Sequence, residues 1–155
     1  MRRPLRALLR SGIAAAAAFA CGAALAGQAL DFRSVAEDGA VLYDAPSTRS
    51  KRLFVLSRQY PLEVVVSVEG FAKVRDAGGD LAWIESRQLS TQRTVVVRAA
   101  TAEVRHSADD AAAVVFRVER EVVLELVEPG PGPWARVRHR DGQTGFLRAA
   151  AVWGM

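Results

Sequence analysis

The sequence has almost no cysteine and little histidine. The single cysteine, Cys21, has no partner for a disulfide within the chain, and two histidines without a second cysteine do not make a structural zinc site. We therefore expect no metal and no cofactor. At 50% apolar residues the chain is too hydrophobic for a disordered protein, and 155 residues allow one ordinary domain or two very small ones.

Residues 1–26 have the layout of a secretory signal peptide. Four arginines and no acidic residue fall within the first ten positions, residues 12–25 are uncharged and largely apolar, and Ala24-Leu25-Ala26 closes the stretch. That order predicts export to the periplasm or the exterior, with cleavage after Ala26.

Two alternatives for the leader stay open. A retained anchor would bind a membrane only through the uncleaved leader, but its apolar run of about 14 residues is shorter than the roughly 20 that a spanning helix needs. Lipidation of Cys21 is the other alternative, which the preceding Ala18-Phe19-Ala20 fits poorly.

Loss of the leader changes the charge balance. The leader holds four of the 21 basic residues and none of the 17 acidic ones, so the remaining chain is formally neutral. Nucleic-acid binding needs a basic footprint, which a neutral chain lacks overall, so we expect no nucleic-acid partner. An exported chain without disulfides must be held together by core packing.

One sequence pattern occurs twice after the leader. Residues 71–75, Phe-Ala-Lys-Val-Arg, precede residues 134–138, Trp-Ala-Arg-Val-Arg, by 63 positions, and the match continues without a gap to Leu89 and Val152. Upstream the offset is 62, and the one-residue change falls in the Pro/Gly-rich residues 128–133. These matches indicate an internal duplication.

Each copy has the pattern of short strands. Residues 63–68 and 121–128 are rich in valine, and apolar and basic residues alternate through 71–75 and 134–138. Residues 77–80 and 140–143 each contain glycine, which predicts a tight turn and hence a hairpin in each copy.

The segment Ala111 to Leu126 is ambiguous, because an amphipathic helix also fits it. Its residue Val123 corresponds to Pro61 in the first copy, and a helix interior does not accept proline without a kink. We therefore predict strands here, and an all-β protein of two tandem small barrels, at residues 31–90 and 94–153.

The order of these features resembles bacterial SH3-like (SH3b) domains. That family has an early Asn-Val-Arg-x-x-Pro-Ser type of motif, an aromatic-x-x-Val strand and a Gly-Trp-Val step. Here the first copy keeps Pro46-Ser47 and the second keeps Val104-Arg105. In the first copy the aromatic-x-x-Val strand corresponds to Phe71 to Val74, and the Gly-Trp-Val step to Ala82-Trp83-Ile84. In the second copy these two motifs correspond to Trp134 to Val137 and to Gly145-Phe146-Leu147.

The resemblance implies binding rather than catalysis, with a peptide, a peptidoglycan fragment or an envelope protein as partner. Strand alternation puts Trp134 on the outer face with Arg136, and Phe71 likewise sits beside basic residues. An outward aromatic next to a cation can bind an apolar ligand that bears a carboxylate. With Tyr43, which falls where family members place a groove residue, these four are the predicted ligand-binding residues.

The remaining aromatic residues have other expected roles. Trp83 and Phe146 neighbour predicted core residues and are expected to be structural. Trp153 follows the last strand of the second copy and is predicted to be either a lid or a wedge between the barrels.

Catalysis lacks the necessary residues. His106 and His139 occur without a Gly-x-Ser-x-Gly or other nucleophile setting, and the adjacent Asp109 and Asp110 would point to opposite faces of a strand. We therefore predict an exported, non-enzymatic binding module. The alternative is a structural scaffold whose barrels pack together without a ligand groove, and an envelope hydrolase would require an acidic cleft that the spacing does not show.

Overall fold

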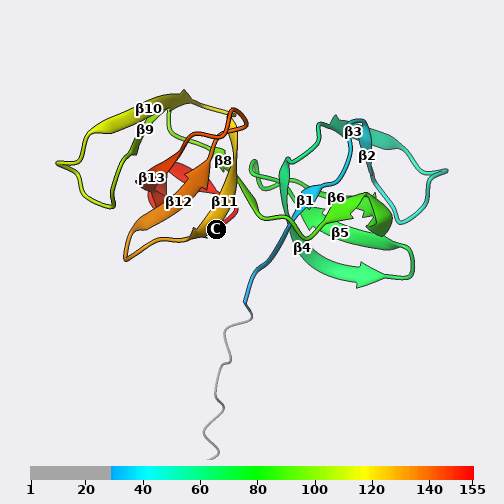
Figure 1. The fold of residues 1–155 in the computed structure, drawn as a ribbon. Helices are drawn as coiled ribbons and strands as arrows, with labels where there is room; N and C mark the ends of the chain where they lie inside the picture. The colour runs from blue at the N-terminus through cyan, green and yellow to red at the C-terminus, as the bar shows by residue number, and fades with distance from the viewer. Residues whose placement is uncertain (1–28) are drawn as a thin grey trace, which may run out of the picture.

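The computed structural model describes residues 29–155 as two small β-barrels that follow one another along the chain (Figure 1). The expected leader, residues 1–26, lies outside the described residues. Within 29–155, no helix has the length and apolar character needed to cross a bilayer.

The first barrel contains seven strands and one short 3₁₀ turn, η1 (Ser86–Gln88), in a sheet of order β3-β2-β6-β5-β4-β1-β7. Its strands are β1 (Asp31–Val35), β2 (Ala40–Tyr43), β3 (Arg52–Leu56), β4 (Pro61–Val68), β5 (Phe71–Arg75), β6 (Leu81–Glu85) and β7 (Leu89–Ser90).

The second barrel repeats this order element by element, as β10-β9-β13-β12-β11-β8-β14, and again has one 3₁₀ turn, η2 (Ala149–Ala151). Its strands are β8 (Thr94–Val97), β9 (Thr101–Arg105), β10 (Val114–Glu119), β11 (Val123–Pro129), β12 (Trp134–Arg138), β13 (Thr144–Arg148) and β14 (Val152–Trp153). All neighbouring strands in both sheets are antiparallel. The all-β prediction and the duplication are confirmed.

The segment that could have been a helix forms two strands, β10 and β11. Pro61 is the first residue of β4 and Val123 the first residue of β11, so the two copies share this boundary. A proline is tolerated at the first position of a strand, where no ladder hydrogen bond from its nitrogen is needed. The comparison of the copies therefore selected the correct alternative.

The two predicted hairpin turns use glycine at equivalent positions. Gly79 has φ +96° and Gly142 has φ +94°, a backbone region that side chains with a Cβ rarely enter. The turns join β5 to β6 and β12 to β13, which puts the aromatic start of β5 and β12 at the same place in each barrel.

Each barrel has its own hydrophobic core. Leu62, Val74 and Ile84 are at most 1% exposed in the first core, and the equivalent Leu124, Val137 and Leu147 are at most 1% exposed in the second. Full burial of such side chains contributes about 1.5–3 kcal/mol each, so the cores stabilise both units without disulfides.

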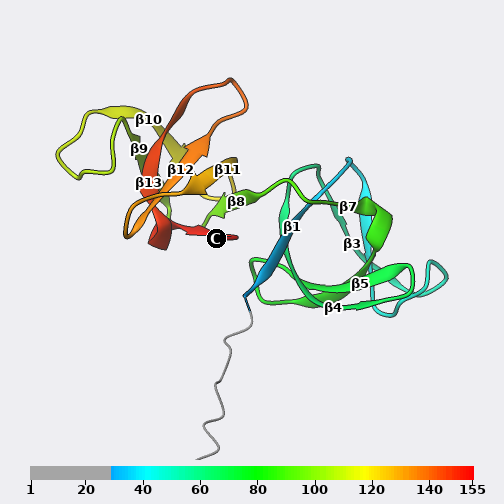
Figure 2. The same ribbon diagram turned by 60° about the horizontal axis from the view of Figure 1, so that its bottom comes forward.

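The barrels touch through a small interface beside the linker (Figure 2). The Trp153 ring meets the Phe32 ring edge to face, with centroids 5.1 Å apart, and the Thr94 hydroxyl donates a hydrogen bond to the Gln59 carbonyl at 2.7 Å. Of the two roles predicted for Trp153, the structure therefore shows the wedge between barrels.

Candidate functional site

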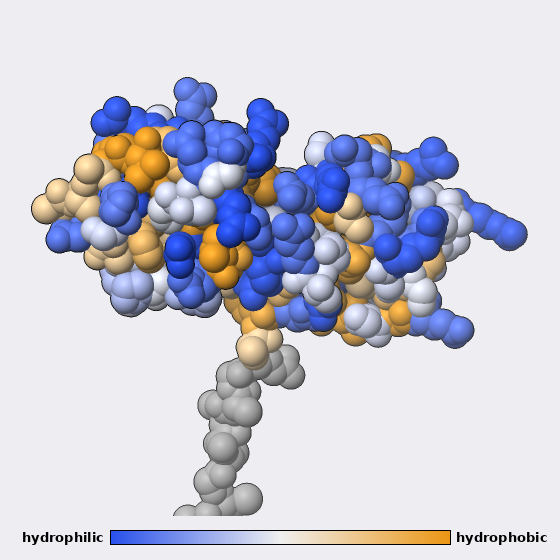
Figure 3. All heavy atoms as spheres, viewed as in Figure 1, coloured by the Kyte–Doolittle hydropathy of each residue, from blue (hydrophilic) through white to orange (hydrophobic). Residues whose placement is uncertain are grey.

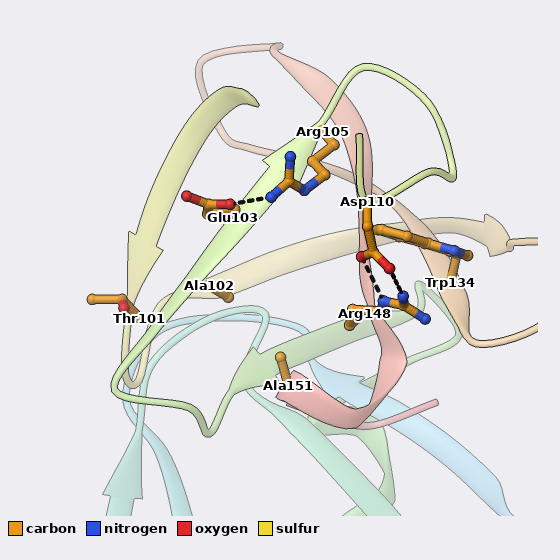
Figure 4. A pocket seen from close by; sticks show the side chains of 8 residues that line it. All are labelled: Thr101, Ala102, Glu103, Arg105, Asp110, Trp134, Arg148 and Ala151. Carbon is orange, nitrogen blue, oxygen red and sulfur yellow. Dashed lines mark hydrogen bonds and ion pairs between the residues drawn. The ribbon is translucent and has the colours of Figure 1, made fainter. Parts of the chain in front are cut away.

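The second barrel contains a groove of about 240 Å³ on the surface formed by β9, β12, β13 and the loop between β9 and β10. Small residues, Thr101, Ala102 and Ala151, line part of it. Its charged and aromatic lining consists of Glu103, Arg105, Asp110, Trp134 and Arg148 (Figure 4).

Trp134 lies against the guanidinium of Arg148. The two residues are directly opposite each other in the β12–β13 ladder, and the Arg148 Cζ atom is 4.4 Å from the Trp134 ring centroid. A cation at this distance from an indole face is attracted by the ring quadrupole. The Arg148 side chain nevertheless remains 44% exposed, so a ligand can reach it.

Asp110 holds the other side of Arg148. Arg148 Nε donates to Asp110 Oδ1 at 3.1 Å and Arg148 Nη2 donates to Asp110 Oδ2, which makes a two-point ion pair (Figure 4). A bidentate pair of this kind fixes the orientation of the guanidinium plane. Arg148 is therefore positioned before any ligand arrives.

A second ion-pair network lines the groove. Arg105 donates to Glu103 and, at 2.7 Å, to the Ala112 carbonyl, while Arg117 donates to the other oxygen of Glu103 at 2.9 Å. The groove and its rim thus hold three guanidinium groups and two carboxylates. This excess of positive charge favours an anionic group in a bound ligand.

A Pro/Gly-rich loop positions Trp134 at the start of β12. The Gly130 N–H donates to the Trp134 carbonyl at 2.9 Å, and a Cβ on Gly130 would come within 2.8 Å of that oxygen. Only glycine permits this close approach, so Gly130, in the loop that contains the one-residue insertion, helps to hold the tryptophan.

The first barrel has different residues on the equivalent surface. Tyr43 and Phe71 meet edge to face there, with ring centroids 6.4 Å apart, and Glu85 occupies the position of Arg148. Val41 replaces Glu103, so the charged network of the second barrel has no counterpart.

The four predicted ligand-binding residues therefore fall into three places. Tyr43 and Phe71 are brought together on the first barrel, Trp134 lies in the groove of the second, and Arg136 does not line that groove. Arg136 instead donates to Glu128 at 3.0 Å and lies 6.0 Å from the Phe146 ring centroid.

The exposure of the aromatic residues differs from the expectation. Trp134 is on the predicted outer face but is only 6% exposed, because its own barrel covers it, and Tyr43 is 5% exposed. Phe71 is half-buried. Because the Trp134 ring is covered, a ligand would contact the guanidinium groups around the ring and not the ring itself.

Trp83 and Phe146 are half-buried on the outer faces of their barrels, and neither belongs to a core. Lys73 lies 5.9 Å from the Trp83 ring centroid, in the position that Arg136 takes beside Phe146. Their neighbours Ile84 and Leu147 point inward, so the two aromatic side chains point outward, and their structural role stays a prediction.

Sequence reasoning missed Arg148 and Asp110. Arg148 carries a usable signal, since counting outward from the predicted turn at residues 140–143 pairs it with Trp134. Asp110 carries none, because it lies in a loop 38 residues away from Arg148 along the chain. Residues 29–155 contain no cluster of three or more His, Cys, Asp or Glu side chains placed to hold a metal ion.

Comparisons with solved structures give only distant likenesses. Two NlpC proteins of Trichomonas vaginalis, NlpC2 and NlpC1, are 15% and 16% identical, with TM-scores of 0.36 and 0.37; the matches cover 81% and 83% of this chain and 48% and 47% of theirs. An NlpC/P60 family protein of Bacillus cereus ATCC 10987 is 16% identical, with a TM-score of 0.38 and coverage of 79% and 55%. The chain spans about half the length of these proteins, and scores this low support no functional conclusion.

The family assignment comes from the sequence match. No curated protein matches the chain. The model of the bacterial SH3 domain matches it twice, over residues 36–91 and 98–154, which is most of the described chain; each match covers one barrel from its second strand onward. The protein therefore belongs to the bacterial SH3 domain family and carries two copies of the domain in tandem.

Proposed function

We propose that the protein is an exported, non-enzymatic module that binds a peptide, either released from the cell wall or presented by an envelope protein, in the groove of the second barrel. Bacterial SH3 domains are binding modules, which supports a binding role. The choice of this groove rests on Arg148, whose guanidinium lies against the buried Trp134 ring while its side chain remains 44% exposed.

The groove suits a peptide that bears a carboxylate. A guanidinium has five N–H donors, and Asp110 takes two from Arg148, which leaves others for a ligand. Hydrogen bonds between a guanidinium and a carboxylate are about twice as strong as neutral ones. The small residues Ala102 and Ala151 leave room beside Arg148 for the backbone of an extended ligand.

The scaffold alternative has one observation in its favour, the contact between Phe32 and Trp153. That contact uses β1 and β14, whereas the groove is built on β9, β12 and β13. Packing of the barrels therefore leaves the groove accessible, and a scaffold role does not replace the binding proposal.

The test is capture of peptides from an enzymatic digest of purified cell wall and of proteins from envelope extract. Residues 27–155, which include both cores, serve as bait beside Arg148→Gln and Trp134→Ala. Because Trp134 is buried and its loss can unfold the barrel, Arg148→Gln is the decisive variant. Arg138→Gln is the matched control, since Arg138 is an exposed arginine of the same barrel that is ion-paired with Glu125.

We expect the parent and Arg138→Gln to retain the same ligand and Arg148→Gln to lose at least tenfold in affinity, since a hydrogen bond to a charged group is worth about 1.5–3 kcal/mol. Equal capture by Arg148→Gln and the parent would remove the groove as the site. Hydrolysis of the digest by the parent protein would contradict the non-enzymatic part of the proposal.

A further inference from the structure

Strand β3 of the first barrel has one unpaired edge. It is the terminal strand of its sheet and pairs only with β2, and no other strand of residues 29–155 lies along its second edge. The backbone N–H and C=O groups on that edge are free to pair with another extended chain.

The side chains of β3 are unusually apolar for an exposed strand. Val55 is 68% exposed and Phe54 is 51% exposed, next to each other in the middle of the strand. At the equivalent positions the second barrel has Arg117, which is paired with Glu103, and Phe116, which packs against the core. In the middle of its terminal strand the second barrel thus has an ion-paired arginine, where the first has an exposed apolar side chain.

Cations flank this apolar centre. Arg49, Lys51 and Arg52 precede it and Arg58 follows it; all four are exposed, and none forms an ion pair with another described residue. In Figure 3, apolar atoms lie between hydrophilic side chains at the top of the first barrel, where Figure 1 places β3.

The nearby carboxylates are used elsewhere. Asp44 accepts a hydrogen bond from the backbone N–H of Lys51 at 3.0 Å, and Asp38 accepts one from the backbone N–H of Arg58 at 2.8 Å. Both stabilise the ends of the β2–β3 hairpin, and the cationic side chains remain available.

The three leading cations are not a requirement of the fold. Arg49, Lys51 and Arg52 correspond to Ala111, Ala113 and Val114 in the second barrel, which forms the same hairpin without them. Their presence beside an open edge in the first barrel therefore calls for a reason other than stability.

We propose that β3 binds an extended polypeptide segment that carries acidic residues around apolar ones, by addition of a strand to the sheet edge. Backbone pairing would supply affinity, Phe54 and Val55 would cover apolar side chains of the segment, and the flanking cations would pair with its carboxylates. This site is on the other barrel and does not rest on the groove proposed above.

A second copy of this chain is a poorer occupant. Antiparallel pairing of two β3 strands brings the start of each strand beside the end of the other, so Lys51 and Arg52 of one copy would approach Arg58 of the second. Like charges across a strand pair are destabilising. A segment with acidic residues is therefore a better partner for this edge than the β3 strand of a second copy.

The probe is a fluorescein-labelled heptapeptide of alternating glutamate and valine with blocked ends, titrated into residues 27–155 and followed by anisotropy. Two matched peptides accompany it: one with lysine in place of glutamate, and one with the central valine replaced by proline, which removes a backbone donor. Backbone amides of residues 52–56 are followed by hydrogen exchange in the same samples.

The protein variants separate this site from other cations. We expect the double variant Lys51→Glu, Arg52→Glu to lose at least tenfold in affinity for the glutamate peptide. Arg140→Glu, an exposed arginine of the second barrel without an ion pair to another described residue, should bind as the parent does. Arg148→Gln reports any part of the binding that takes place in the groove of the second barrel instead. Far-UV circular dichroism verifies that each variant is folded.

Binding of the glutamate peptide alone, with slower exchange of the β3 amides, supports the proposal. Three results would overturn it: no binding of the glutamate peptide, equal binding of the proline peptide, which would mean adsorption by charge only, or equal loss in Arg140→Glu. Loss in Arg148→Gln with full binding by the double variant would move the peptide to the groove and also refute the β3 site.

Discussion

The equivalent residues Leu62 and Leu124 allow the independence of the two cores to be measured. Leu62 is fully buried in the first core and Leu124 is 1% exposed in the second. Replacing a buried leucine with alanine costs about 2–5 kcal/mol, from the lost transfer free energy and the cavity that remains. A barrel of this size has a total stability of roughly 3–9 kcal/mol at 0.05–0.15 kcal/mol per residue. One such change therefore removes a large share of one barrel's stability.

The assay is native-state hydrogen exchange, read separately for amides of β5 and β12. Leu124→Ala should lower the free energy of opening of β12 by about 2–5 kcal/mol. In β5 the loss should be much smaller, since the barrels have separate cores and meet through the Phe32–Trp153 contact and a few hydrogen bonds, such as that from Thr94 to Gln59. Leu62→Ala should show the reverse. Equal losses in both strands for either variant would mean a single cooperative core and would refute the two-barrel account.

Three further predictions concern the interface, the alkaline limit and the backbone. Trp153→Ala should remove the ring contact with Phe32 and let the barrels unfold at separate midpoints in urea, whereas Trp153→Phe should retain most of the coupling. Burial raises the pKa of the Tyr60 hydroxyl above its ordinary value. The stability that the neutral Tyr60 contributes is therefore present below pH 10 and is lost as the pH rises through the raised pKa. In thermal melts, Tyr60→Phe should flatten that decline in stability. Gln59 and Glu121, at equivalent turns, have φ of +69° and +68°. Replacing either residue with glycine should raise Tm, because it relieves about 1 kcal/mol of backbone strain. A lower Tm would contradict this prediction.

The elements of the fold could be predicted because each copy of the repeat checks the other. Pro61 excluded a helix at Val123, and Gly79 and Gly142 placed the two hairpin turns. Alternation along β5 and β12 also placed the inward residues correctly. Apart from the comparison of the two copies, these signals are local and span at most one hairpin.

The site could be predicted only in part, because its decisive contacts are not local. Trp134 was placed on the correct face, but Arg148 lies over its ring, and Asp110 holds Arg148 there from the loop of a different hairpin. The unpaired edge of β3 is likewise a property of the sheet order, and no periodicity in the sequence shows which strand ends a sheet.

The most direct test of the central claim follows Trp134 fluorescence during ligand binding. In a chain of residues 27–155 in which Trp83 and Trp153 are phenylalanine, Trp134 is the remaining tryptophan. Titration with the peptide fraction of a cell-wall digest should change its emission to a saturating value, and Arg148→Gln in the same background should abolish that change. An emission that stays constant in the parent while the peptides demonstrably bind would place the ligand away from this groove.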